Sequence, residues 1–451
     1  MKLFPTVAGP ANNSTSTSNW RFALRALAHR NYRLFFSGQT ISLIGTWMTR
    51  LATSWLVYRL TNSAFLLGVI GFASQFPAFL LGPIAGVWVD RLNRHQVLVV
   101  TQVLSMIQSF WLAALALTHH ITYNDIFCLS IFQGAINAFD MPARQAFVTQ
   151  MVESREDLPN AIALNSSMVN ASRLIGPALA GIVIAAVGEG WCFFIDGASY
   201  IAVIISLLMM RLTVQQVTRK RESVLVELRD GWRYVSRFKP IRAILLLLAM
   251  VSLFGMPYTI LMPIFARDVL HGGANTLGLL TGATGIGALV SAGYLAMRKS
   301  VRGLVRLLPT VTVVFGLALL GLGFSRWLPL SMFILLFAGF GMMQAMAASN
   351  TVLQTIVEED KRGRVMSFYA MSFMGMAPFG SLMAGSLAAR VGAPVTVMIS
   401  GAVCMVGALV FYTQLPGIRV LIRPIYVRLG ILPEMATGVQ QASNLQSTLE
   451  R

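Results

Sequence analysis

Five charged residues interrupt long apolar stretches of this sequence. They are Arg50, Asp140, Arg144, Arg173 and Asp196, and all five lie in the N-terminal half. A charged side chain at the centre of an apolar helix costs several kcal/mol when it faces hydrocarbon, so such residues usually belong to a binding site or a proton relay. The chemistry open to them is uptake of a proton, binding of an opposite charge, or pairing with one another.

The two aspartates are candidate proton carriers. A carboxylate in a low-dielectric site can bind and release a proton near neutral pH. The alternative for Asp140 is a permanent pair with Arg144, four residues later, which can meet it on one helix face. The alternative for Asp196 is a capping or pairing role near the outer surface. The sequence leaves both alternatives open.

Arg50 and Arg173 are candidate ligands for an anionic group of a substrate. At about 1.5 Å per residue, the depths of both, counted from the cytoplasmic end, reach past mid-membrane. The C-terminal half has no acidic residue well inside its apolar stretches. Its candidates for substrate binding are neutral: Tyr258, Gln344 and Asn350.

The composition indicates a membrane protein. Of 451 residues, 56% are hydrophobic and only 12% are charged, and the mean hydropathy is +0.68. Soluble domains normally carry about 25% charged residues, so this composition argues against a soluble enzyme. The three cysteines have no metal-ligand spacing, and the adjacent His119 and His120 have no evident partner for binding a metal. No phosphate-binding Gly-x-x-x-x-Gly-Lys motif is present. We therefore expect no enzyme activity, no cofactor and no metal.

Twelve apolar stretches are long enough to cross a bilayer, which needs roughly 20 residues each. They run near 33–58, 64–88, 96–118, 122–150, 160–187, 191–211, 241–266, 276–297, 303–325, 329–356, 364–389 and 393–415. We predict an all-α polytopic membrane protein with twelve transmembrane helices.

The basic residues fall on one side of these helices. Of the 35 Lys and Arg residues, 28 lie in the tails, the central linker and the loops on that same side, and four lie in the opposite loops. Positive charge accumulates on the cytoplasmic side of membrane proteins. We therefore predict cytoplasmic termini. The net charge of +18 is then a topology signal, because residues spread over separate loops do not form a nucleic-acid site.

The two halves repeat each other. A shift of 204 residues places Gly176, Gly181, Gly188 and Gly197 on Gly380, Gly385, Gly392 and Gly401. We expect two pseudo-symmetric six-helix bundles, with a binding site between them at mid-membrane. The predicted units are a tail with an interfacial helix (1–32), a bundle (33–212), a basic linker (213–240), a second bundle (241–416) and a tail (417–451). Helical periodicity in the linker predicts a helix on the anionic membrane surface.

The loop after the second stretch carries a glycine, an aspartate and two arginines, namely Gly86, Asp90, Arg91 and Arg94. This pattern resembles the loop motif of the major facilitator superfamily, although Asn93 and His95 depart from it. The resemblance implies a cytoplasmic gate, to which we also assign Arg144. In the family the aspartate faces a helix N-terminus of the other half, here near residues 363–366, where the helix dipole favours an anion.

The fifth stretch contains Gly176, Pro177 and Gly181, which resemble the helix motif of facilitator exporters and antiporters. Proline and two glycines predict a kinked helix with a flat packing face. Further similarity to bacterial drug- and siderophore-efflux permeases covers residues 20–428 and includes Trp191, Phe194 and Asp196.

The resemblance implies a secondary transporter of the bacterial inner membrane that exports small amphipathic molecules in exchange for protons. Its expected partners are the substrate, protons and membrane lipid, and it is expected to be a monomer. Two alternatives stay open. One is an accessory protein that binds lipid or a partner without net transport, and the other is an uptake symporter.

Overall fold

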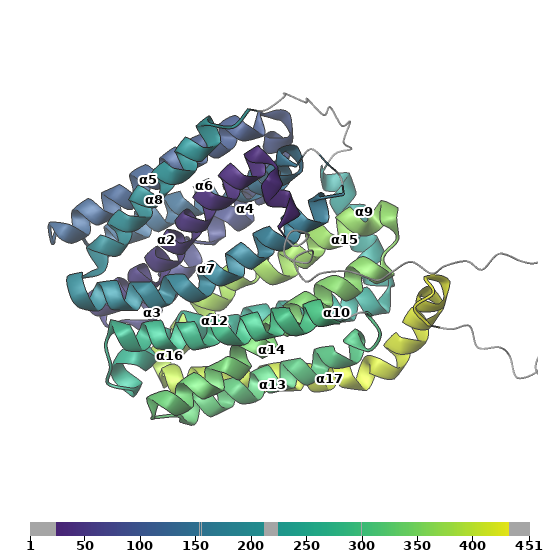
Figure 1. Cartoon of the computed structure of the whole chain (residues 1–451). Coiled ribbons are helices and arrows are strands. Elements are labelled where there is room, and N and C mark those ends of the chain that lie inside the picture. The colour runs from purple at the N-terminus through teal and green to yellow at the C-terminus, as the bar shows by residue number, and fades with distance from the viewer. Residues whose placement is uncertain (1–23, 153, 155, 212–223, 299, 433–451) are drawn as a thin grey trace, which may run out of the picture.

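The computed structural model describes residues 24–432, apart from 153, 155, 212–223 and 299, and this part of the chain is nearly all helical (Figure 1). We call each long helical segment that corresponds to one predicted span a rod. Nine of the rods in the described part are single long helices. These are α2 (Arg30–Thr61), α5 (Arg94–Leu117), α6 (Tyr123–Met151), α7 (Leu158–Val187), α8 (Glu189–Leu208), α12 (Ala274–Met297), α13 (Leu304–Phe324), α14 (Leu328–Ile356) and α17 (Ala393–Arg428).

Three further rods are broken. The second consists of α3 (Ala64–Ala73) and α4 (Phe76–Arg91), and the eleventh of α15 (Glu359–Ala370), a π turn and α16 (Ala377–Val391). The seventh begins as α10 (Lys239–Met250) and continues through π and 3-10 turns and α11 (Met262–Ile264) to Val269. A proline follows each break closely, because it has no N–H to continue the helical ladder.

The rods are consistent with the predicted twelve spans. Ten helical segments are long and apolar enough to cross a membrane. The first rod, α2, and the eleventh, α15 with α16, occupy the two remaining predicted positions. The prediction of an all-α polytopic fold is therefore confirmed.

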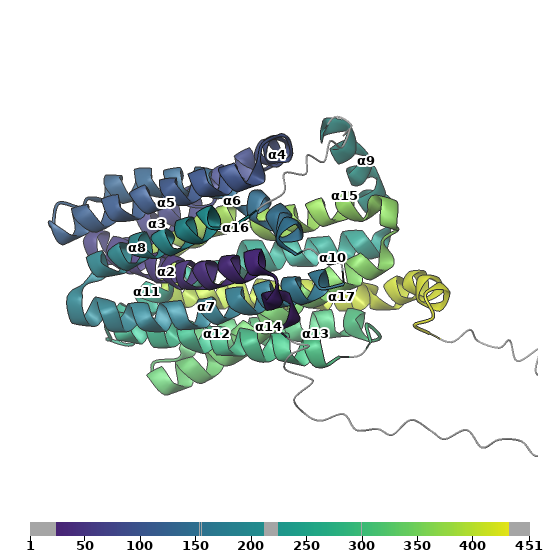
Figure 2. The ribbon, with the colours of Figure 1, turned by 45° about the horizontal axis from the view of Figure 1, so that its top comes forward.

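The rods form two bodies, which Figure 1 shows one above the other, α2 to α8 in purple to teal and α10 to α17 in green to yellow. Helices α7 and α12, and helices α3 and α16, pack across the boundary between the bodies. Helix α9 (Val224–Arg237) and α15 lie together at one end in both views (Figures 1 and 2). We call this the linker end, and the opposite end the loop end.

The segments at the linker end differ in detail from expectation. The predicted linker helix exists as α9, and its Trp232 ring lies 6.1 Å from the Phe368 ring of α15. Residues 25–28 form a short 3-10 helix that docks on the start of α7, where Arg25 pairs with Asp157 at 3.0 Å. Residues 1–23 and 433–451 lie outside the described part. Helix α17 continues to Arg428, beyond the predicted end near 415, because Ile418 and Ile422 are buried in the second body.

The internal repeat is visible in the packing of its glycines. A Cβ on Gly176 would meet the carbonyl oxygen of Ile44 in the first rod at 2.9 Å, and one on Gly380 would meet that of Leu253 in the seventh at 2.4 Å. Gly188 and Gly392 both end a helix with positive φ, at 92° and 85°. The repeated glycines thus occupy equivalent places in the two bodies.

Two glycine seams join the bodies near the loop end. In one, a Cβ on Gly385 would lie 2.6 Å from the Cα of Gly68. In the other, a Cβ on Gly181 would lie 3.1 Å from the Cα of Gly278. Small residues let helix backbones approach this closely. Because Gly385 and Gly181 are repeat partners, the two seams are pseudo-symmetric and hold the loop end closed.

The contact between Gly385 and Gly68 leads to a prediction for the variant Gly385→Ala. The added methyl would meet backbone atoms of Gly68 and Ala64, at 2.6 and 2.7 Å, which cannot move cheaply. We expect the loop end to open more often, so that a cysteine at buried Ser381 reacts several-fold faster with a membrane-impermeant maleimide in intact cells. The matched control is Gly82→Ala, where an added carbon meets nothing within 4 Å. Equal labelling rates in the two variants would show that the seam does not control closure.

Candidate transport sites

Asp140 lies in a polar network inside the first body, in which both of its carboxylate oxygens have partners. Its carboxylate pairs with Arg144 on the same helix, α6. It also accepts hydrogen bonds from the Thr101 hydroxyl at 3.0 Å and the Gln102 amide at 2.8 Å, both on α5. A buried charge that is paired and hydrogen-bonded is suited to hold two helices together. This geometry matches the structural alternative for Asp140 better than the proton-carrier role.

Asp196 is also buried, at 2% exposure, but its surroundings are different. It is positioned by α8 and accepts hydrogen bonds on Oδ2 from Thr49 of α2 and Ser109 of α5, both at 2.9 Å. Oδ1 has no hydrogen-bond partner, and no ion pair to Asp196 occurs among the described residues. The residue therefore sits in the core between three helices, not in the capping role considered from the sequence.

Arg50 and Arg173 come together on one aromatic ring. The Cζ of Arg50 lies 4.9 Å from the centre of the Trp47 ring, and that of Arg173 lies 5.1 Å from it. Arg50 and Trp47 are on α2, and Arg173 reaches the ring from α7. A Cβ on Gly176 would lie 2.5 Å from the Cβ of Trp47. The glycine of the fifth stretch therefore lets α7 approach closely enough to bring Arg173 to Trp47.

The two guanidiniums have like charge and no carboxylate partner. Both lie about 5 Å from one ring centre, so they are at most about 10 Å apart. At that separation and an effective dielectric constant of about 20, two unit charges repel by roughly 1–2 kcal/mol. No hydrogen bond or ion pair of either guanidinium occurs in the described part of the chain, and the Arg173 Nε is buried without a partner. The pair is thus a concentrated positive site.

The predicted substrate ligands of the C-terminal half are not all at this site. Tyr258, in the seventh rod, is buried and lies near Arg173. Gln344 instead accepts a hydrogen bond from Ser291 at 2.8 Å inside the second body. Asn350 accepts one from Gln354 on its own helix. No described contact joins Gln344 or Asn350 to the arginine pair.

The residues of the predicted cytoplasmic gate lie around the turn between α4 and α5. Gly86 has open space around it, so close helix contact does not explain this glycine in the present conformation. The side chain of Asp90 lies outside the described part. Arg91 ends α4 and Arg94 begins α5. The departures from the motif have local roles, because Asn93 caps α5 and His95 bonds to the Leu207 carbonyl at 2.8 Å.

The expected docking region for Asp90 is less favourable than the sequence indicated. Helix α15 begins at Glu359, so Gly363 lies in its second turn. Its first turn already carries Glu359 and Asp360, which occupy the positive end of the helix dipole. A hydrogen bond to Glu358 raises the pKa of Lys361, which keeps this side chain of the first turn cationic. Contact between Asp90 and this region stays a prediction.

A polar contact that the sequence did not reveal closes the loop end. The Tyr58 hydroxyl, at the end of α2, donates a hydrogen bond to Asp268 of the seventh rod. Beside it, Arg267 donates to the Asn62 side chain at 2.7 Å and lies 5.9 Å from the Tyr58 ring. We call these four residues the loop-end latch. They join the first rod of one body to the first rod of the other.

Gly176, Pro177 and Gly181 lie on the faces of α7 that pack against α2 and α12. Gly176 faces α2, as described above. The Pro177 carbonyl would meet a Cβ on Gly278 at 2.9 Å, and Gly181 faces the backbone of Ala274, both on α12. The motif therefore forms contacts within the first body and between the bodies.

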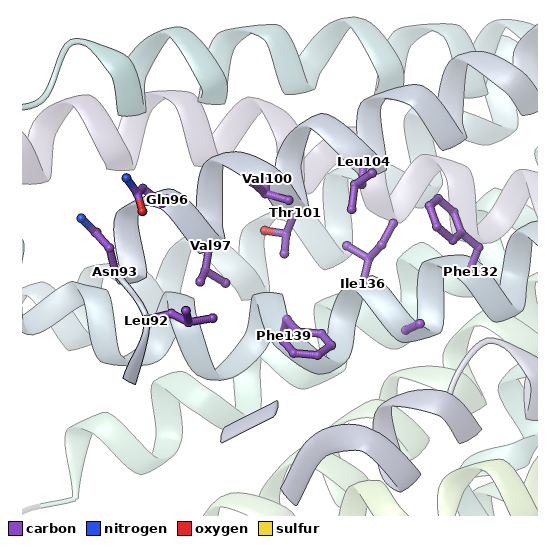
Figure 3. A pocket seen from close by; sticks show the side chains of 11 residues that line it. Leu92, Asn93, Gln96, Val97, Val100, Thr101, Leu104, Phe132, Ile136 and Phe139 are labelled. Atoms are coloured by element: carbon purple, nitrogen blue, oxygen red, sulfur yellow. The ribbon is translucent and has the colours of Figure 1, made fainter. Parts of the chain in front are cut away.

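A large apolar hollow of about 430 Å³ lies between α5 and α6, away from the arginine pair. Figure 3 shows Val97, Val100 and Ile136 along it and Asn93 and Gln96 near its linker end. All of its lining residues belong to α5, α6 and the turn before α5, so it lies within one body. A substrate site between the two bodies, as alternating access requires, is therefore not this hollow.

Sequence patterns alone missed Trp47, Thr49, Ser109 and the latch. Their types are common in membrane helices, and only the packing of distant rods gives them partners. A weak signal exists for Trp47, because it lies three residues before Arg50, on the same helix face.

Comparisons with known proteins agree with this architecture. Residues 22–420 match the transmembrane secretion effector family of the major facilitator superfamily. The staphyloferrin A transporter of Staphylococcus aureus is 26% identical over 385 residues, covering 84% of this chain and 95% of its own. The enterobactin exporter EntS of Citrobacter koseri is 25% identical over 390 residues, covering 85% and 91%.

Another relative is the multidrug efflux pump Tap of Mycolicibacterium fortuitum, 25% identical over 357 residues that cover 77% of this chain and 87% of the pump. Among solved structures, a bacterial homologue of the iron transporter ferroportin, in an inward-facing state, has a TM-score of 0.67. It is 15% identical, and the match covers 86% of this chain and 98% of that one. The chain is a multi-pass membrane transporter, not an enzyme, and it belongs to the transmembrane secretion effector family of the major facilitator superfamily.

Proposed function

We propose that this transporter exports small amphipathic molecules from a bacterial cell in exchange for protons, by alternating access. Relatives named as an enterobactin exporter, a multidrug efflux pump and a macrolide efflux protein support the direction of transport. Family membership favours transport over an accessory role. The uptake alternative differs only in direction, which accumulation assays distinguish.

The observation that carries the proton exchange is the isolation of Asp196. Burying a carboxylate without an opposite charge is costly, and a bound proton removes that cost. Hydroxyl donors at Thr49 and Ser109 stabilise the ionised form in part, which allows both forms to exist. Asp140 has no such reason to take up a proton, because the positive charge of Arg144 balances its ionised form.

Alternating access requires contacts between the bodies that can break and re-form. The two glycine seams and the loop-end latch are such contacts, and all lie at the loop end. We propose that the bodies rock about the mid-membrane region, opening this end after the linker end has closed. In the reverse state, Gly86, Asp90, Arg91 and Arg94 are proposed to close the linker end.

The proposed orientation places the linker end in the cytoplasm. Nearly all Lys and Arg residues of the tails and loops are on that side, which supports cytoplasmic termini. The exposed arginines of α9 are suited to the anionic membrane surface. We propose a monomer, because each body packs its rods within one chain.

The first prediction concerns Asp196→Asn, which keeps the size of the side chain but cannot bind a proton. In proteoliposomes with an imposed pH gradient, we expect gradient-driven accumulation of the substrate to be lost. Exchange of labelled for unlabelled substrate without a gradient should persist, since the substrate site is separate. Enterobactin, staphyloferrin A and a macrolide are the compounds to test first.

The matched control for this prediction is Asp140→Asn. It leaves Arg144 unpaired, so we expect a lower yield of folded protein, but any folded protein should keep its dependence on the pH gradient. If Asp196→Asn accumulates substrate as the unmodified protein does, the proposed proton site is wrong. If both variants do so, neither carboxylate couples transport to protons.

A second prediction concerns the loop-end latch. Tyr58→Phe removes the hydroxyl that donates to Asp268, and loss of a hydrogen bond to a charged group typically costs about 1.5–3 kcal/mol. We expect the closed state to be populated less, so a cysteine at Ser381 is labelled on the order of 10- to 100-fold faster in intact cells. Tyr412→Phe, on an exposed residue of α17, is the control. Equal rates for the two variants would contradict a role of the latch in closure.

A further inference from the structure

We propose that Arg50, Arg173 and Trp47 bind the anionic head of a substrate that also carries a flat apolar group, such as an aromatic carboxylate. The inference deepens the proposed transport function and rests on it, because it assigns the substrate class of the exporter. Nothing in the family match fixes that class, since the relatives' names cover chemically different molecules.

The first argument is charge balance. Two guanidiniums present ten N–H donors between them, and none has a protein acceptor among the described residues. The third arginine of the membrane interior, Arg144, is neutralised by Asp140. Arginines that only support a fold are expected to have such partners, so the unpaired two require an anion from outside the chain.

The second argument is shape. A guanidinium is planar and binds a carboxylate through two parallel hydrogen bonds. Two guanidiniums against one indole place these donors beside a flat apolar surface. A ligand with a carboxylate on an aromatic ring satisfies both features at once. A cation of the same shape is repelled by both arginines.

The third argument is position. Arg50 is exposed although it lies well inside α2. Arg173 is half-buried, and Tyr258 approaches it from the other body. A ligand at the arginine pair therefore touches groups whose relative position changes when the bodies move. Such a ligand binds the two states differently, which is what a transported substrate must do.

The test uses the full-length protein in detergent and three naphthalene compounds of nearly equal size. These are 2-naphthoate (anionic), 2-naphthamide (neutral) and 2-naphthylmethylammonium (cationic). Binding is measured by calorimetric titration, together with the shift in thermal unfolding temperature. We expect binding and stabilisation by the anion only. Arg50→Gln and Arg173→Gln should each weaken the affinity for 2-naphthoate by about 10- to 100-fold, because each removes one charged contact.

The unliganded variants give a second, independent readout. Removing one of two mutually repelling charges should leave the unfolding temperature of the ligand-free protein unchanged or raise it. If the arginines only hold α2 to α7 through Trp47, both variants should lower it. The matched control is Arg298→Gln, on an arginine that stacks on Tyr294 and donates to its hydroxyl at 3.0 Å. This variant should bind 2-naphthoate normally.

Failure of the inference is distinct from failure of the transport proposal, because binding in detergent needs neither a gradient nor net transport. Absence of 2-naphthoate binding to the unmodified protein, or equal binding of the cation, would overturn the anion site. So would unchanged affinity in both arginine variants, or a lowered unfolding temperature in both unliganded variants. Anion binding without transport would instead uphold the site and contradict the exporter.

Discussion

The cost of placing charge in an apolar interior governs the arrangement of this transporter. Five charged residues interrupt the apolar stretches of the first body, and their surroundings are of three kinds. Asp140 and Arg144 neutralise each other. Asp196 has only hydroxyl donors, and Arg50 and Arg173 have only an aromatic ring. Because burying an unbalanced charge is costly, we infer that the imbalance marks the proposed sites for an external proton and an external anion.

The glycines provide the second constraint, because they allow rods to meet at backbone distance. Gly176 brings α7 to Trp47, while Gly181 and Gly385 bring each body to the other through pseudo-symmetric seams. Contacts made by backbone and small side chains involve no large interdigitating side chains, so the surfaces can separate without rearranging either body. The latch at Tyr58 and Asp268 adds a directional bond to the same end. The loop end is thus held by few, identifiable contacts.

The sequence predicted the rods and the unusual charges well, and their partners poorly. Hydropathy placed the helices because a bilayer imposes one length on every span. The pairing of Asp140 with Arg144 follows from a spacing of four residues. The partners of Asp196 come from rods 147 and 87 residues away, so no local pattern indicates them. Position along one helix does not indicate which helices surround a residue, so the sequence did not reveal that Asp196 is buried between α8, α2 and α5.

Helix α2 connects the two unbalanced sites. Gly45 and Thr49 face Asp196, while Trp47 and Arg50, on an adjacent face of the same turns, meet Arg173. Tyr200 of α8 is near enough to interact with the charge of Arg50, and its hydroxyl lies 3.4 Å from that of Thr46. A tilt or rotation of α2 therefore changes the surroundings of the carboxylate and of the arginine pair together. Because the proposed proton and anion sites both depend on the position of α2, we expect occupation of either site to change the free energy of occupying the other, and such linkage is reciprocal.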